Sequence, residues 1–193
     1  MRNEPKLKPA GSGLPFLERQ ALRLLCVPIS LQCTSWNRSR QRFIDEAAAC
    51  LEIYRQLPPE KCSQKVLIKR LGGFEDSSRY WSPSMVLEHM VLVAKAMTNI
   101  IVTLDREQYL VFDARITQFK PKENHEACLA GFFDTSMREC AERLQHVNNR
   151  NSRATHAHPW FGKLNAHGWH TVLALHQKIH RQQLELIRDA LKG

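Results

Sequence analysis

A helical stripe at the C-terminal end of the chain constrains the fold more than any other feature. Seven residues at steps of three and four fall on one face of a helix: Trp169, Leu173, His176, His180, Leu184, Ile187 and Leu191. The apolar members predict a face that packs against a helical core. The two imidazoles lie one turn apart, and their burial in an apolar seam is costly unless their nitrogens find partners. A divalent metal ion is such a partner, because histidines at i and i+4 of a helix converge on one ion.

Three more segments carry helical periodicity and predict a bundle together with a last helix over residues 165–193. They cover residues 39–57, 82–104 and 136–148. Pro58-Pro59 ends the first segment, and Ser82-Pro83 supplies an N-cap followed by proline at the first helical position of the second. The connections after the first two helices have about 25 and 30 residues, whereas neighbouring antiparallel helices are usually joined by about 2–8. Such long connections let consecutive helices run parallel or cross the end of the bundle.

The first 35 residues differ from the remainder in charge and flexibility. They are basic and include Pro9-Ala-Gly-Ser-Gly-Leu-Pro15, so we expect residues 1–35 to form a loosely packed extension or a short helix and residues 36–193 to form the bundle. The chain carries a net charge of +9, and eight Lys or Arg against two Glu place six of these charges in residues 1–42. A weakly charged body with a basic leader is not typical of a groove-binding protein, so we expect no nucleic-acid partner.

Neither the apolar segments nor the cysteines indicate a membrane or secreted protein. No run reaches the roughly 20 consecutive apolar residues that span a bilayer, and the uncharged segment 24–37 is short and interrupted by Pro28. The six cysteines form no CxxC pair and have no regular spacing, which favours reduced thiols over a disulfide framework. We therefore expect a cytoplasmic protein without a membrane partner.

His89 adds a third imidazole to the pair on the last helix. It lies on the apolar stripe of the segment 82–104, and a lone histidine on such a face is more often a satisfied core residue than a ligand. Together with His176 and His180 it makes three inward imidazoles, the number of protein ligands in a catalytic zinc site with an open position. Such a site lowers the pKa of a bound water or thiol. We expect the remaining histidines outside the 158–162 segment to lie in solvent: His125, His146, His156, His167 and His170.

Two phrases of the sequence resemble the DinB-like superfamily of bacterial four-helix proteins. The first is His158-Pro-Trp-Phe-Gly162, then Trp169 and His176-x-x-x-His180-x-x-Gln183; the second is Trp81-Ser-Pro-Ser-Met-Val-Leu-Glu-His89. The resemblance covers about residues 36–193. It implies an all-α four-helix bundle in up-down-down-up order with long crossover connections, and it places the metal-binding histidines at His89, His176 and His180. The implied ion is zinc, with nickel as the alternative.

Several residues around these histidines are candidates for the pocket wall or for partners of the metal ligands: Trp81, Glu88, His158, Trp169 and Gln183. The segment 158–162 has two interpretations, a structural turn that caps the core or a part of the pocket. The segment 105–135 contains the apolar stretches 109–113 and 116–119, which we expect to pack over one end of the bundle as a pocket wall.

The function stays open among three hypotheses. Relatives in the resembled superfamily include S-transferases that use bacillithiol and an isomerase that uses mycothiol, which implies a thiol-dependent S-transferase. A metal-dependent hydrolase and a non-catalytic stress-response binding module are the alternatives, and no catalytic residue is assigned. The helical stripes offer no acid or base beside the histidines; a metal-bound thiol ionises near neutral pH without one. We expect a small-molecule thiol or electrophile as partner and leave a homodimer open.

Overall fold

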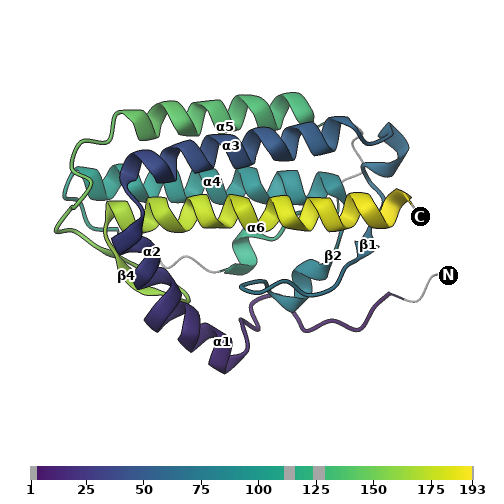
Figure 1. Cartoon of the computed structure of the whole chain (residues 1–193), viewed down its shortest axis with the longest axis horizontal. Coiled ribbons are helices and arrows are strands. Elements are labelled where there is room, and N and C mark those ends of the chain that lie inside the picture. Colours follow the sequence, from purple (N-terminus) through teal and green to yellow (C-terminus); the bar gives the residue numbers. More distant parts are fainter. Residues whose placement is uncertain (1–3, 111–115, 124–128, 193) are drawn as a thin grey trace.

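Four long helices lie side by side in the computed structural model, which describes residues 4–110, 116–123 and 129–192 (Figure 1). They are α3 (Trp36–Arg55), α4 (Pro83–Asp105), α5 (Ala130–Gln145) and α6 (Ala166–Lys192). Both α3 and α4 pack against α6 and, on another side, against α5. The prediction of a mostly helical bundle is confirmed.

Side-chain contacts between the helices show which of their ends meet. Ser39 near the start of α3 lies 3.3 Å from Thr171 near the start of α6, measured between the two hydroxyl oxygens. At the same end of the bundle, Arg40 of α3 donates to Gln145 of α5, Arg143 of α5 donates a hydrogen bond of 2.7 Å to Asn99 of α4, and the amide of Asn148 donates to Asp105. The starts of α3 and α6 and the ends of α4 and α5 therefore lie together at one end of the bundle.

The helix boundaries follow from caps where caps are present. The Ser82 hydroxyl accepts a hydrogen bond of 3.2 Å from the Met85 amide, and the Asn165 side chain accepts one of 2.9 Å from Gly168, so the predicted starts of α4 and α6 are confirmed. The predicted start of the third helix at residue 136 is wrong, because α5 begins at Ala130. Its first turns contain buried Phe133 beside exposed Phe132, and two adjacent aromatic residues hide the helical period.

Two short hairpins interrupt the expected all-helical architecture. Strand β1 (Val66–Leu67) pairs antiparallel with β2 (Tyr80–Trp81) in the α3–α4 connection. Strand β3 (His156–His158) pairs antiparallel with β4 (Gly162–Leu164) just before α6. These pairs bring Trp81 and His158 against the bundle. The expectation of a purely α fold is therefore corrected: long connections between helices need some backbone pairing where they cover a core.

The N-terminal segment lies along one side of the bundle (Figure 1). It contains α1 (Phe16–Ala21), a π-helical turn (Leu22–Cys26) and α2 (Val27–Cys33). Glu18 of α1 forms an ion pair of 2.8 Å with Arg70 of the α3–α4 connection. The outer side of this segment exposes large apolar side chains: Phe16, Leu17, Leu24, Leu25 and Ile29. The domain boundary after residue 35 stays a prediction.

Helix α4 is both long and apolar. Among the described helices it alone is long and apolar enough to cross a membrane, with a mean hydropathy of 1.5 over its best 18-residue window. Glu88 and Lys95 interrupt its apolar run, and 56% of that window is buried inside the bundle. These are properties that a core helix shares.

Candidate metal centre

Three histidines from two helices converge at one point of the bundle. His89 on α4 and His176 and His180 on α6 each offer a ring nitrogen, and these nitrogens lie within 4.8 Å of one another. The Nε2 atoms of His89 and His176 are 3.1 Å apart. Two nitrogens on a common zinc ion, each at about 2.0–2.1 Å, are separated by about 3.0–3.4 Å. The three residues that the helical stripes singled out therefore form a group that can hold a metal ion.

In His89 and His180, hydrogen bonds determine which ring nitrogen is free to bind a metal ion. His89 Nδ1 lies 2.6 Å from the Phe119 carbonyl oxygen, which can only accept, so Nδ1 carries the proton and Nε2 keeps its lone pair. The Gln183 amide nitrogen donates to the Ser78 carbonyl at 2.8 Å, so its oxygen accepts from His180 Nδ1 at 2.7 Å. His180 Nε2 is thereby left as the ligand atom. Such outer hydrogen bonds orient metal-binding imidazoles in proteins.

The ring of His176 lacks such an orienting hydrogen bond among the described residues. His176 Nδ1 is buried and has no hydrogen-bond partner among the described residues. Its Nε2 is the atom that approaches His89. Because the lone pair of His89 Nε2 faces His176 Nε2, one metal ion can bind both Nε2 atoms, and His176 Nδ1 then carries the ring proton. The donor set therefore fits a divalent ion with three protein ligands.

Burial keeps all three imidazoles neutral. It lowers the pKa of His89 to about 4. Burial, reinforced by the neighbouring histidines, lowers the pKa values of His176 and His180 well below the ordinary value. Neutral imidazoles are the form that binds a metal, so no proton has to be removed at neutral pH.

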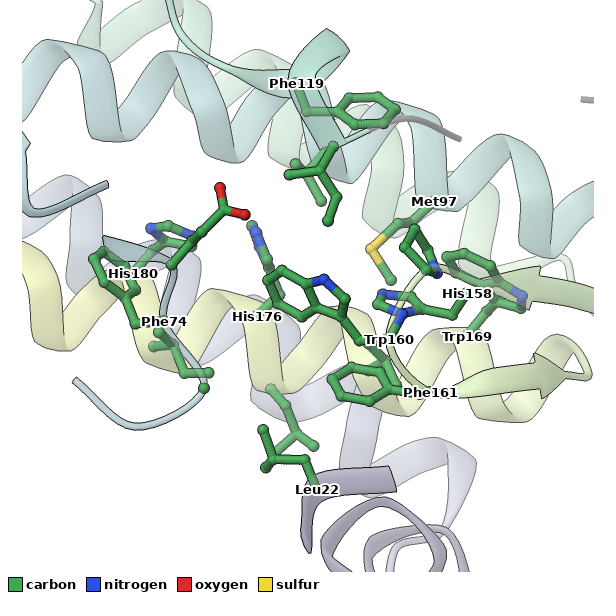
Figure 2. A pocket seen from close by; sticks show the side chains of 18 of the residues that line it. Leu22, Phe74, Met97, Phe119, His158, Trp160, Phe161, Trp169, His176 and His180 are labelled. Atoms are coloured by element: carbon green, nitrogen blue, oxygen red, sulfur yellow. The ribbon is translucent and has the colours of Figure 1, made fainter. Parts of the chain in front are cut away.

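The histidines line a cavity of about 210 Å³ (Figure 2). Helices α4 and α6 form one wall, and loops and the N-terminal segment form the others. Apolar side chains from all of these parts line the space, including Leu22, Phe74, Met97, Phe119, Trp160 and Phe161. A metal bound here would face an apolar chamber that excludes water from much of its surroundings.

The predicted wall from segment 105–135 is present in part. Ile116 and Phe119 line the cavity, as expected. Tyr109 is 76% exposed, so its predicted packing over the bundle end is wrong. Helix α4 ends at Asp105 and Glu107 has a φ of 56°, so the helical stripe does not continue to Tyr109. Residues 111–115 lie outside the described part of the chain.

Three aromatic candidates surround the histidines. The Trp81 ring is buried and stacks on His180 with a centroid separation of 6.1 Å and an interplanar angle of 6°. Trp169 and His158 line the cavity on the side away from the N-terminus of α4. Burial, together with the nearby His156, lowers the pKa of His158 to about 3. His158 is therefore neutral, and it enters the chamber as an uncharged aromatic group.

The two interpretations of the segment 158–162 turn out to be compatible. Gly162 has a φ of +82°, which a residue with a side chain rarely adopts, and it allows the β3–β4 turn. Trp160 and Phe161 line the cavity, and His158 stacks on Phe161 at 4.4 Å. The segment therefore makes a turn whose side chains also form part of the pocket.

The polar candidates Gln183 and Glu88 act at different places. Gln183 is fully buried and links His180 to the Ser78 carbonyl. Glu88 is half-buried and does not line the cavity; its carboxylate accepts a hydrogen bond of 3.1 Å from the Lys122 amide. This bond secures the backbone just after Phe119, whose carbonyl orients His89.

Glu75 is a pocket residue that the sequence reasoning missed. It is 6% exposed and lines the same cavity as the three histidines. Its Oε1 accepts a hydrogen bond of 2.8 Å from the Gly13 amide, and its Oε2 accepts from the Gly11 amide and the Ser77 hydroxyl at 3.2 and 3.0 Å. Its charge raises the pKa of His89 and so opposes the effect of burial. Glu75 precedes a 3-10 turn in a loop, and no helical periodicity could have indicated it.

The remaining histidines follow the prediction only in part. His146 is exposed, and His167 is half-buried and donates to the Thr34 carbonyl at 2.9 Å. His156 and His170 are buried, so their expected exposure is wrong. His170 stacks on Trp36 of α3 at 4.0 Å, because the start of α6 is covered on several sides. His125 lies outside the described residues.

Comparisons with known proteins bear on the fold alone. No family model matches the chain, and no curated protein sequence matches it. Among solved structures, the crystal structure of TT2238, described as a four-helix bundle protein, is similar with a TM-score of 0.54 and 22% sequence identity. The match covers 78% of this chain and 98% of that one. The chain thus shares a four-helix-bundle fold with TT2238.

Proposed function

We propose that this chain is a metal-dependent enzyme of the DinB-like type, with His89, His176 and His180 as the ligands of one divalent ion. Zinc is the ion we propose first, and nickel is the alternative. The observation that carries the proposal is the convergence of three neutral imidazoles on a mostly apolar cavity. The starts of α3 and α6 and the ends of α4 and α5 lie together at one end of the bundle, which supports the up-down-down-up order of that superfamily.

The reaction we propose is the transfer of a small-molecule thiol to an electrophile. A divalent ion held by three imidazoles supplies an open position at which a thiol or water ionises near neutral pH. The chain's own groups orient the imidazoles: the Phe119 carbonyl holds His89, and Gln183 holds His180. The apolar lining binds the body of the electrophile and keeps water away from the sulfur. The thiol sulfur then forms a bond to the electrophilic carbon as the thiol proton and the leaving group depart.

A metal-dependent hydrolase is the second candidate, since the buried carboxylate of Glu75 in the cavity is equally suited to take a proton from water. Water would then replace the thiol as the nucleophile. A non-catalytic stress-response module on the same bundle is the third alternative. In each case the proposed ligands are small molecules rather than nucleic acid or a membrane.

One assay separates these candidates. Zinc-loaded protein is incubated with glutathione and 1-chloro-2,4-dinitrobenzene, and separately with 4-nitrophenyl acetate without thiol. Thiol transfer predicts metal-dependent thioether formation in the first mixture, lost in His176→Ala and kept in His146→Ala, which alters an exposed histidine. Thiol-independent ester cleavage with no effect of added thiol would contradict thiol transfer and favour the hydrolase. Inactivity in both mixtures despite bound zinc would favour the binding module.

A further inference from the structure

We infer that Glu75 is the proton acceptor for the thiol that enters the cavity, and that the N-terminal segment holds its carboxylate in position. This role rests on the proposed metal-dependent thiol transfer. Glu75 is the one carboxylate among the described residues that line the cavity. Burial of an ionised carboxylate is costly unless hydrogen bonds or charges compensate it, and the Gly11 amide, the Gly13 amide and the Ser77 hydroxyl supply such hydrogen bonds to Glu75.

The hydrogen bonds of Glu75 from the described residues leave one lone-pair site of its carboxylate without a donor. Oε2 accepts from both the Gly11 amide and the Ser77 hydroxyl, whereas Oε1 accepts one bond from the described residues, that of the Gly13 amide. A carboxylate oxygen has two lone-pair sites. One site on Oε1 is therefore left for a donor that enters the cavity.

The backbone around Glu75 is tied to the histidine cluster on both sides. The preceding residue, Phe74, packs its ring on His180 with centroids 5.6 Å apart. A few residues later, the Ser78 carbonyl accepts from Gln183, which in turn holds His180. Glu75 lies between these two anchors, so its carboxylate keeps a fixed place relative to the proposed metal ligands.

Two glycines of the N-terminal segment make this arrangement possible. Gly11 and Gly13 have φ angles of +85° and +74°, and their amides donate to the two oxygens of one carboxylate. Residues with side chains rarely adopt such φ angles. The same segment lines the cavity with Leu22 and Val27. The N-terminal segment is therefore a part of the candidate site.

The thiol proton moves to Glu75 and is released again at the end of the reaction. The S–H bond of the incoming thiol breaks, its electron pair stays on sulfur, and the proton passes to Oε1 of Glu75. When the sulfur has attacked the electrophile and the leaving group departs, Glu75 returns the proton to that group or to solvent. The loss of this proton regenerates the carboxylate for the next cycle.

The test compares thiol binding by cobalt-loaded wild-type protein, Glu75→Gln and a matched control. The probe is 2-mercaptoethanol at pH 6.5, followed by the thiolate-to-cobalt charge-transfer absorption. Asp76→Asn is the control, because Asp76 lies in the same turn and accepts from the Lys8 amide at 2.9 Å but does not line the cavity. We expect E75Q to bind one Co²⁺ and to bind the thiol about tenfold more weakly or worse, and D76N to match the wild type.

The direction in which thiol affinity changes in E75Q tests whether Glu75 takes the thiol proton. A carboxylate that takes no proton repels a thiolate, so its removal would leave thiol affinity unchanged or raise it, and either result in E75Q overturns the inference. If circular dichroism shows that E75Q does not fold, Glu75→Asp replaces it. The shorter side chain withdraws the carboxylate, and thiol affinity equal to the wild type in folded E75D overturns the inference. Failure of the wild type to bind Co²⁺ overturns the metal site together with this role.

Discussion

Replacement of Gln183 tests whether the hydrogen-bond chain behind His180 matters for metal binding. The fully buried Gln183 side chain accepts from His180 Nδ1 at 2.7 Å and donates to the Ser78 carbonyl at 2.8 Å. Gln183→Met keeps the length of the side chain and removes both bonds. The His180 ring then loses its orienting partner, and the Ser78 carbonyl loses its donor.

These contacts set the expected losses of folding stability and of metal affinity in Gln183→Met. An unsatisfied buried polar group costs about 1–3 kcal/mol, and the Ser78 carbonyl is only partly buried, so together the two lost bonds should cost about 2–4 kcal/mol of unfolding free energy. For a chain of this size, each kcal/mol lowers Tm by about 2–4 °C. We therefore expect a fall in Tm of about 5–15 °C in the metal-free protein. Loss of a partner behind a metal ligand lowers metal affinity about 10–100-fold.

Two further variants separate orientation from packing. Gln183→Glu keeps an acceptor for His180 Nδ1 but removes the donor to Ser78, so it should lose stability and retain the zinc affinity of the wild type. Gln177→Met changes another fully buried glutamine of α6 that does not line the cavity, so its zinc affinity should also be unchanged. Zinc affinity is measured by competition with a chromophoric chelator, and Tm by circular dichroism. Wild-type zinc affinity in Q183M would refute the orienting role of Gln183.

Three other predictions concern the scaffold. Phe43→Ala removes a core ring of α3 that is 0% exposed and should cost about 3–5 kcal/mol in urea unfolding; a loss below about 1 kcal/mol would contradict this packing. Burial lowers the pKa of His170 to about 3, whereas the unfolded pKa is about 6.5. Below about pH 6.5 the unfolded chain therefore binds a proton that the folded protein does not bind. The free energy of unfolding falls as the pH drops toward 3, by about 2 kcal/mol at pH 5. His170→Phe should flatten unfolding free energy between pH 7 and 5, and an unchanged slope would count against a neutral buried His170. Ser82→Ala removes the cap of Met85 and should cost about 1 kcal/mol, with no change in Tm as the contrary result.

Local patterns predicted the helices and the three histidines because each depends on residues close in sequence. The stripe that contains His176 and His180 is set by the period of a single helix, and Ser82 and Asn165 cap helices through their own neighbours. His89 could be added because inward faces of bundle helices meet in one core. These arguments need no knowledge of the loops.

The features of the site and core that the sequence did not predict depend on contacts between segments far apart in the chain. Glu75 enters the cavity because the backbone of Gly11 and Gly13 crosses its loop, and the sequence holds no period that links these residues. The Phe119 carbonyl that orients His89 is a backbone group, which residue types do not reveal. His170 is buried because α3 covers the start of α6 with Trp36. Tertiary packing decides all three cases.

The metal content of the purified protein tests the central claim most directly. Protein is loaded with zinc, freed of excess metal by gel filtration and analysed for elements beside His89→Ala, His176→Ala, His180→Ala and the exposed-site control His146→Ala. The account predicts about one divalent ion per chain in the wild type and in H146A, and little or none in the other three variants. Wild-type protein that retains no divalent ion, or an H176A variant that retains as much as the wild type, would contradict a metal centre formed by these three histidines.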